Sequence, residues 1–562
     1  MVPDFKDVQA DRPSLEEMSN KLAAIQELFH KAGSQADRHQ CIMQWDSLRR
    51  NLETWTSLTH LNFAQDTKNP DYKAEQDFAD EVLPGFTNLE VGMKQMLLGS
   101  EHRQEMAGAI GDHAFRLWES DIKTFDPVVK EDLVQEAKLK AKYIQLMASA
   151  EIEIDGKTVN LPGIQPYITH ENRELRYEAV TKRWKFFEDN QEQFDGIYNE
   201  LTALRTKMAK ALNFKDYVGL GYERMQRVDY NAEDVARFRK QVVEDLVPLC
   251  VELREKQREA LGVEKLMYWD EAVHSKSGNP TPKGGGDWMI EQAKTMFNDM
   301  NPELGDFFSM MADKGYLDLE TREGKAGGGF CTSFPSIGVP FVFANFNGTK
   351  HDAEVFTHEI GHAFQNWCSR KHQPLDYLWP TYESCEIHSM SLEFLCWPHM
   401  ELFFKESAEE FRKLHLIESL FFIPYGVAVD DFQHRIYENP DATPEERHAM
   451  WLEVEKLYMP WRDYGDLDFL GAGRRWQLQR HIYLMPFYYI DYTLAQTCAL
   501  QFWVRAEEDR DEAMASYVEL CKRGGKAAFQ TLARSADLVS PLEDGCLKQV
   551  VAKARKLFAE QY

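Results

Sequence analysis

Two histidines four residues apart, with a glutamate between them, are the clearest chemical feature of this chain. They are His358, Glu359 and His362, in the pattern His-Glu-x-x-His. On a helix, side chains at i and i+4 lie on one face, so both imidazoles can point at one position. Two imidazoles that leave a coordination position open suit Zn²⁺, and Glu359 would lie beside the ion as a general base. The pattern predicts a catalytic site with one zinc ion per chain.

The segment around these residues has the periodicity of a buried helix. Apolar side chains recur at helical spacing, at Phe356, Ile360, Phe364 and Trp367. Two histidines and a glutamate are costly inside such a helix unless a ligand compensates them, which favours a metal site over a chance match. Gly361 is a poor helix former, so we expect another stretch of backbone to pass close to the helix at that turn.

A zinc site built from one helix needs a third protein ligand. The longer pattern with a third histidine is absent, because Cys368 stands six residues after the second one. Residues 382–394 have the pattern of a second helix, which offers a carboxylate at Glu386, 24 residues after the second histidine. Glu383 and His388 in the same segment are rival ligands that spacing alone does not exclude.

A glycine-rich segment and a strand precede the histidine helix. Gly328 and Gly329 would let the backbone of a ligand approach closely, although a plain flexible turn explains them equally well. Residues 340–346 have strand composition. We expect an edge strand that pairs with an extended peptide and lays its scissile bond over the metal. The substrate contacts expected on this strand are Phe343, Ala344 and Asn345.

An aromatic segment near the end of the chain contains His481 and several tyrosines. Such stripes mostly pack in a core. Near a metal, however, phenol and imidazole groups can donate hydrogen bonds to the oxyanion of a tetrahedral intermediate. The sequence does not decide which of the tyrosines contact substrate; the candidates are Tyr483, Tyr488, Tyr489 and Tyr492.

The charge and composition exclude several classes of partner. A net charge of −27 argues against binding nucleic acid or an anionic membrane; it could favour cationic substrates, but solubility explains it more simply.

We find no apolar run of membrane-spanning length and no secretory signal at the start. Nine cysteines without a Cys-x-x-Cys pair indicate reduced thiols and a cytoplasmic protein. Nothing in the sequence indicates an oligomeric state.

The chain is mainly helical, with one hairpin marking its N-terminal third. Alternating apolar residues flank Asp155-Gly156 and predict a β-hairpin over residues 151–161. Helical patterns precede and follow it. We place a boundary near residue 190, giving an N-terminal helical lobe over 1–190 that walls the site and a catalytic domain over 191–562.

These motifs together resemble the thimet oligopeptidase and oligoendopeptidase F family of zinc metallopeptidases, most closely its bacterial oligoendopeptidase F-like branch. The resemblance covers roughly the last two-thirds of the chain. It is carried by His358-Glu359-x-x-His362, Glu386-x-x-Ser389-x-x-x-Glu393, Ala344-Asn345-Phe346, Leu520-Cys-Lys-Arg-Gly-Gly and Ser540-Pro-Leu-Glu-Asp-Gly-Cys546.

The resemblance implies roles for individual residues. Glu386 would be the third zinc ligand, and Glu393 would hold a ligand histidine in the correct tautomer. His481 and Tyr492, with Tyr488, would stabilise the oxyanion. The implied fold is a mainly α, two-lobed zincin-type peptidase around a deep channel, with a small antiparallel sheet beside the metal helix.

The expected function is zinc-dependent hydrolysis of internal bonds in short, unfolded oligopeptides. Two other functions stay open at this point. A non-catalytic peptide-binding protein could have kept the fold, but an intact Glu359 together with three ligands argues against it. An exopeptidase would need a subsite for a terminal charge, and the sequence does not identify one.

Overall fold

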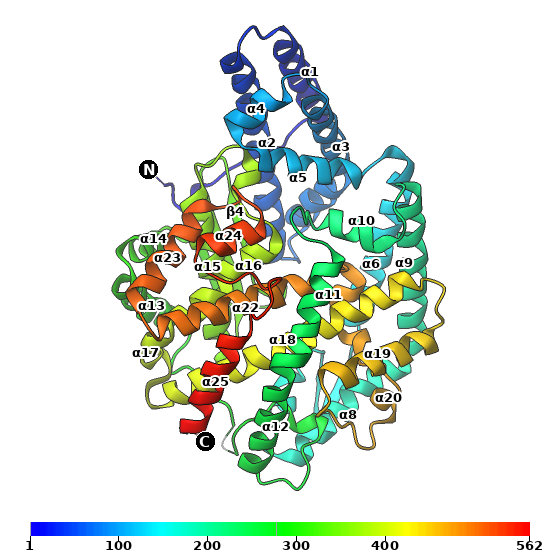
Figure 1. Cartoon of the computed structure of the whole chain (residues 1–562), viewed down its shortest axis with the longest axis vertical. Helices are drawn as coiled ribbons and strands as arrows, with labels where there is room; N and C mark the ends of the chain where they lie inside the picture. Colours follow the sequence, from blue (N-terminus) through cyan, green and yellow to red (C-terminus); the bar gives the residue numbers. More distant parts are fainter. Residues whose placement is uncertain (1, 277, 562) are drawn as a thin grey trace. The chain divides into compact units, whose positions relative to one another are not determined.

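The structure is a computed structural model that describes residues 2–276 and 278–561. It is built mainly from α-helices, with two small sheets, as Figure 1 shows. The predicted mainly α fold is confirmed. None of the helices in the described residues is long and apolar enough to cross a membrane. All nine cysteines are free thiols.

The chain forms two compact units, and each unit is assembled from three separate segments. The first unit holds Met1–Lys123, Thr281–Ala408 and Cys498–Ser540. The second unit holds Thr124–Pro280, Glu409–Thr497 and Pro541–Tyr562. Residue 190 lies inside the second unit, between two consecutive helices, so a functional boundary at that point stays a prediction.

The first unit contains the glycine-rich segment, the strand and both helices of the predicted metal site. Its main elements are α1 (Leu15–Lys31), α2 (Gln35–Gln65), α3 (Pro70–Leu98), α4 (Arg103–Ile110), α5 (Asp112–Lys123), α13 (Gly286–Met300), α14 (Pro302–Lys314), β3 (Leu317–Glu320), β4 (Phe330–Phe334), β5 (Val339–Phe346), α15 (Lys350–Ser369), α16 (Tyr382–Leu395), α17 (Glu401–Phe404), α23 (Arg510–Arg523) and α24 (Phe529–Ser535).

The second unit contains the hairpin and the aromatic segment. Its main elements are α6 (Lys130–Ala148), β1 (Ile152–Ile154), β2 (Lys157–Val159), α7 (Gln165–Ile168), α8 (Arg173–Asp189), α9 (Gln191–Ala211), α10 (Tyr217–Arg224), α11 (Ala232–Gln241), α12 (Val247–Leu261), α18 (Ala408–Glu438), α19 (Pro444–Tyr458), α20 (Asp468–Gly471), α21 (Arg480–Leu484) and α25 (Lys548–Gln561). Helix α22 (Tyr489–Ala506) contributes to both units.

The predicted hairpin is confirmed at its expected turn. Strands β1 and β2 pair antiparallel, with Ile154 opposite Lys157. The two residues between them, Asp155 and Gly156, have φ angles of 50° and 71°. Positive φ at both central positions is what a type I′ hairpin turn demands, and Asp-Gly satisfies it at low steric cost.

Strand β5 is the centre of the other sheet. The strand order is β3-β5-β4, with β3 parallel to β5 and β4 antiparallel to it. The prediction that residues 340–346 form an edge strand is therefore wrong, and the sheet is mixed rather than wholly antiparallel. The parallel partner β3 has only four residues. So short a strand leaves too little periodicity in the sequence to reveal its pairing.

Helices α15 and α16 pack directly on each other (Figure 1). Phe356, Ile360 and Phe364 of α15 are fully buried, as the apolar periodicity predicted. A Cβ atom built on Gly361 would lie 2.6 Å from the carbonyl oxygen of His388 and 2.6 Å from Cα of Ser389. The predicted close backbone neighbour of Gly361 is thus confirmed, and it is α16.

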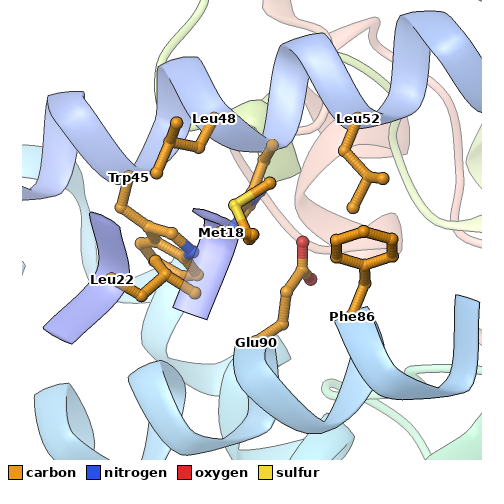
Figure 2. Close-up of a pocket in the computed structure, with 8 residues that line it drawn as sticks. Met18, Leu22, Trp45, Leu48, Leu52, Phe86 and Glu90 are labelled. Atoms are coloured by element: carbon orange, nitrogen blue, oxygen red, sulfur yellow. The ribbon is translucent and has the colours of Figure 1, made fainter. Parts of the chain in front are cut away.

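An apolar cluster joins α1, α2 and α3 of the first unit. Between these helices lies a cavity of about 10 Å³. Figure 2 shows the carboxylate of Glu90 pointing between Met18 and Phe86 into this space. A cavity of that size holds at most one water molecule, so it is not a site for a larger ligand.

Replacing Gly361 by alanine should loosen the contact between α15 and α16. The added methyl group overlaps backbone atoms, which cannot rotate away, and overpacking of this kind costs about 1–3 kcal/mol. We expect a lower midpoint of thermal unfolding. The matched control is Gly196→Ala in α9, where a Cβ would meet nothing within 4 Å. The control should be neutral or slightly stabilising, and equal midpoints for the two variants would contradict the packing argument.

Candidate metal centre and active site

Helix α15 starts from a turn that its own first residues hold in place. The Asp352 carboxylate accepts hydrogen bonds from the backbone N–H of Asn347, at 3.0 Å, and of Gly348, at 2.7 Å. This ties the end of β5 to the first turn of the helix. The direction of α15, and with it the position of His358 and His362, is therefore fixed by the sheet.

His358, His362 and Glu386 come together between α15 and α16. The Nε2 atoms of both histidines lie 3.3 Å from Oε2 of Glu386. One nitrogen or oxygen atom from each residue lies within 4.8 Å of the others. Among the described residues this is the group of three that could hold a metal ion, and the rivals Glu383 and His388 are outside it.

Both rivals are buried on α16 without joining that group. Glu383 and His388 are each 1 % exposed. Nδ1 of His388 hydrogen-bonds the carbonyl oxygen of Ser384 at 2.8 Å, one turn earlier in the same helix. Burial lowers the pKa of His388 to about 4, so this imidazole is neutral near pH 7.

Neighbouring side chains orient two of the three potential ligands. Nδ1 of His358 lies 2.7 Å from Oε1 of Glu393. Because an ionised carboxylate only accepts hydrogen bonds, Nδ1 carries the proton and Nε2 presents a lone pair. Ser389 donates from its hydroxyl to Oε2 of Glu386 at 2.9 Å. Both contacts fix the direction of the atoms that point at the common centre.

The electrostatics of the group favour a positive charge at its centre. Burial raises the pKa of the Glu386 carboxyl, but the two imidazoles outweigh burial and lower it well below its ordinary value. Burial lowers the pKa of His358, but the carboxylates of Glu386 and Glu393 outweigh burial and raise it well above its ordinary value. These carboxylates therefore favour positive charge in the group.

Glu359 is buried beside the group without belonging to it. Burial raises the pKa of its carboxyl above the ordinary value, against the influence of His358 and His362. Its Oε2 atom has no hydrogen-bond partner within the described part of the chain. A buried carboxylate oxygen without a protein partner is costly, so Glu359 fits a group that exchanges a proton with a ligand.

The glycine-rich segment passes next to Glu359. A Cβ built on Gly329 would lie 3.6 Å from Oε1 of Glu359 and 3.1 Å from Cγ1 of Val355. Gly328 has a φ of 100°, a backbone conformation that residues other than glycine rarely adopt. Glycine at these positions thus lets the backbone turn close to the glutamate.

Two side chains hold this segment against the sheet. Asn345 donates from Nδ2 to the carbonyl oxygens of Ala326 and Gly328, both at 2.8 Å. Lys325 is fully buried at its side chain and donates to Oδ1 of Asp318 and to backbone carbonyls of β3 and β5. Sequence reasoning missed this role of Lys325, because the sequence does not distinguish a buried lysine beside glycines from a solvent-exposed one.

The side chains of Phe343 and Ala344 face the core. Both are fully buried, and the Phe343 ring stacks on Phe330 with 4.7 Å between centroids. Of the strand residues expected to contact substrate, Asn345 alone is partly exposed, and its amide group already holds the glycine-rich segment. Any contact of substrate with Phe343 or Ala344 would have to use the backbone.

The aromatic segment forms a cluster around His481 in the second unit. The ring centroid of His481 lies 5.7 Å from Tyr488, 5.0 Å from Tyr489 and 5.8 Å from Tyr492. Tyr483 is excluded from this cluster. It is fully buried, stacks on Tyr143 at 4.0 Å and donates to a backbone carbonyl.

Comparison with known proteins places the chain in a family. Residues 5–125 match the peptidase M3 N-terminal domain, and residues 167–283 and 290–551 match peptidase family M3. Oligopeptidase PepF of Bacillus subtilis (strain 168) is 20% identical over 626 aligned positions, covering 100% of this chain and 88% of the relative.

Solved structures agree with this assignment. PZ peptidase A, solved with an inhibitor, superposes with a TM-score of 0.94 at 45% identity and covers 99% of each chain. A protein of Bacillus anthracis str. Ames assigned as an oligoendopeptidase F gives a TM-score of 0.90 at 43% identity, over 99% of this chain and 98% of that one. The chain therefore belongs to peptidase family M3, a family of metallopeptidases.

Proposed function

We propose that this chain is a zinc-dependent endopeptidase that hydrolyses internal bonds of short, unfolded peptides. In this proposal His358, His362 and Glu386 hold one Zn²⁺, and Glu359 is the general base. The observation that carries it is the convergence of two imidazole nitrogens on one carboxylate oxygen, 3.3 Å away from each. The unpartnered oxygen of Glu359 beside them supports the assignment of the base.

The donor set fits zinc in both chemistry and spacing. Two histidine nitrogens and one carboxylate oxygen are a ligand set that catalytic zinc sites use, with a further position left for water or substrate. Two atoms bound to one tetrahedral Zn²⁺ at about 2.1 Å lie roughly 3.4 Å apart. The nitrogen–oxygen separations of 3.3 Å are close to that value.

The side chains would divide the reaction between them. When bound, the ion supplies Lewis acidity toward the attacking water and the scissile carbonyl. Glu359 takes a proton from the water at its carboxylate and later delivers it to the nitrogen of the leaving amine. Glu393 keeps the proton of His358 on Nδ1, so that Nε2 remains a ligand throughout.

On the family resemblance, His481 and Tyr492, with Tyr488, are proposed to donate hydrogen bonds to the substrate carbonyl oxygen as it gains negative charge. Their mutual packing around one imidazole supports a common role. Gly328, Gly329 and Asn345 are proposed to line the path of the peptide.

The substrate class and location rest on the relatives and on the thiols. The Bacillus subtilis relative is named an oligopeptidase, which supports short peptides as substrates. Free thiols at all nine cysteines support a cytoplasmic protein. A folded substrate would have to supply its unfolding free energy, roughly 5–15 kcal/mol, before its backbone could be extended in a narrow site.

Glu359→Gln should bind zinc normally and lose nearly all turnover. The change removes the proton acceptor and leaves the ligands in place, and loss of a general base costs on the order of 10²-fold or more. Zinc content and hydrolysis of a fluorogenic peptide are measured together. The control is Glu354→Gln, on the same helix, whose carboxylate pairs with Lys350 at 2.6 Å. Activity of Glu359→Gln above roughly a tenth of wild type would refute the assignment.

Glu386→Ala should lose zinc affinity, whereas Glu383→Ala should keep it. Both carboxylates are buried, so zinc content is compared only on protein that unfolds cooperatively. The pair separates a ligand from a neighbouring buried carboxylate on the same helix. A zinc-free Glu383→Ala protein with zinc retained in Glu386→Ala would show that the ligand assignment is reversed.

A mixed peptide library should be cut at internal bonds, in peptides of about twenty residues or fewer, while a stable folded protein stays intact because it resists extension. Mass spectrometry of the products gives the cleavage positions. A chelator should abolish cleavage and Zn²⁺ should restore it. Trimming from one end only would indicate an exopeptidase, and no products would indicate a binding protein. If a denatured long chain is cut at the same rate as the short peptides, the proposed size limit is wrong, but the endopeptidase assignment is unaffected.

A further inference from the structure

A chain of hydrogen bonds in the second unit ends on the imidazole of His481. Tyr425, on α18, donates from its hydroxyl to Oε1 of Gln479 at 2.6 Å. Nε2 of Gln479 lies 2.8 Å from Nδ1 of His481. Gln479 directly precedes α21, and its backbone is held on both sides, by Trp476 and by Ile482. The amide is therefore fixed between a phenol and an imidazole.

The direction of these bonds follows from the group at the far end. The guanidinium of Arg475 lies over the Tyr425 ring, 4.5 Å from its centroid. The phenol has a single proton to donate, and its hydroxyl donates to Oε1 of Gln479. Burial raises the pKa of Tyr425, which keeps that proton in place near neutral pH. The proton goes to the carbonyl end of Gln479.

The amide transmits this direction to the histidine. With its oxygen occupied by Tyr425, Gln479 turns its NH₂ group toward His481. An amide NH₂ can only donate, so Nδ1 of His481 must accept and carries no proton. A neutral imidazole then bears its proton on Nε2.

We propose that Gln479 is a positioning residue that holds His481 as the Nε2–H tautomer, with Tyr425 fixing the direction of the amide. The catalytic part of this inference rests on the proposed function of His481 as a donor to the substrate. An Nε2–H group donates to an oxygen that gains negative charge, whereas the other tautomer would present a lone pair and repel it.

The histidine of the metal group shows the opposite arrangement. At His358 the partner of Nδ1 is the Glu393 carboxylate, an acceptor, so the proton stays on Nδ1 and Nε2 is the nitrogen that can bind a metal ion. At His481 the partner of Nδ1 is an amide donor, so Nε2 has the proton. The same side chain is thus set as a metal ligand at one position and as a hydrogen-bond donor at the other, by the partner of its Nδ1 atom.

The first test reads the tautomer without using activity. The full-length, zinc-loaded protein is labelled with ¹⁵N-histidine, and the ring signals of His481 are identified by their absence in His481→Asn. In wild type, Nδ1 should have the chemical shift of an unprotonated nitrogen and Nε2 that of a protonated one. In Gln479→Glu, a near-isosteric change, the carboxylate accepts and Nδ1 should become protonated. A protonated Nδ1 in wild type would overturn the proposal.

The second test reads the consequence for catalysis. Gln479→Glu should lower kcat by up to the order of 10²-fold, as expected for the loss of one oxyanion donor, with a smaller change in KM. Gln193→Glu adds the same charge at an exposed position of the same unit and should behave as wild type. Tyr425→Phe should lose part of the activity, and Tyr177→Phe, whose hydroxyl binds Asp466 at the surface, should lose none.

The outcomes separate this inference from the proposed function. Full activity of His481→Asn would refute the catalytic role of His481, while the ring signals would still decide the tautomer. A tautomer that switches in Gln479→Glu without any change in kcat would overturn the positioning role of Gln479.

Discussion

The close approach of α15 to α16 at Gly361 is the contact on which the group of His358, His362 and Glu386 depends. The histidines project from one helix and Glu386 from the other, and their atoms meet at 3.3 Å. The two backbones come closest at position 361, where glycine leaves room for the carbonyl of His388. A Cβ at position 361 would lie 2.6 Å from the backbone of α16.

The same contact explains how so many ionisable groups stay buried. Two imidazoles and the carboxylates of Glu359, Glu386 and Glu393 share one small region between the helices. Each would be costly to bury alone. Together they form a set with more negative than positive charge, which favours a bound cation. The opposite pKa shifts of Glu386, which is lowered, and Glu359, which is raised, show that the set is not uniform. One carboxylate faces the imidazoles, and the other, Glu359, has an oxygen without a hydrogen-bond partner in the described residues.

The sequence predicted the site helices well because their periodic patterns are strong. The apolar face of α15 and the poor helix propensity of Gly361 both had visible causes in the chain. The choice among Glu383, Glu386 and His388 could not be made from spacing, because α16 is buried on nearly every side and polar residues occur all around it. Family resemblance supplied that choice, and Glu386 is the residue of α16 that lies with the two histidines.

Other features were hidden for equally physical reasons. The four-residue strand β3 gave no pattern by which to place β5 at the centre of its sheet. Gln479 and Lys325 act through the direction of single hydrogen bonds, and residue type alone does not encode direction. No single linker marks the border between the units, because the chain passes from one unit to the other five times, and one of these crossings lies inside helix α22.

The assembly of each unit from three separate segments has a consequence for biosynthesis. The first unit begins near the start of the chain but is completed only by Cys498–Ser540, and the second unit is completed by residues that follow. Domains made of one continuous segment can fold one after another as they leave the ribosome. Here neither unit can close until most of the chain has been translated. The nascent polypeptide therefore cannot bury all of its apolar helix faces until late in its synthesis.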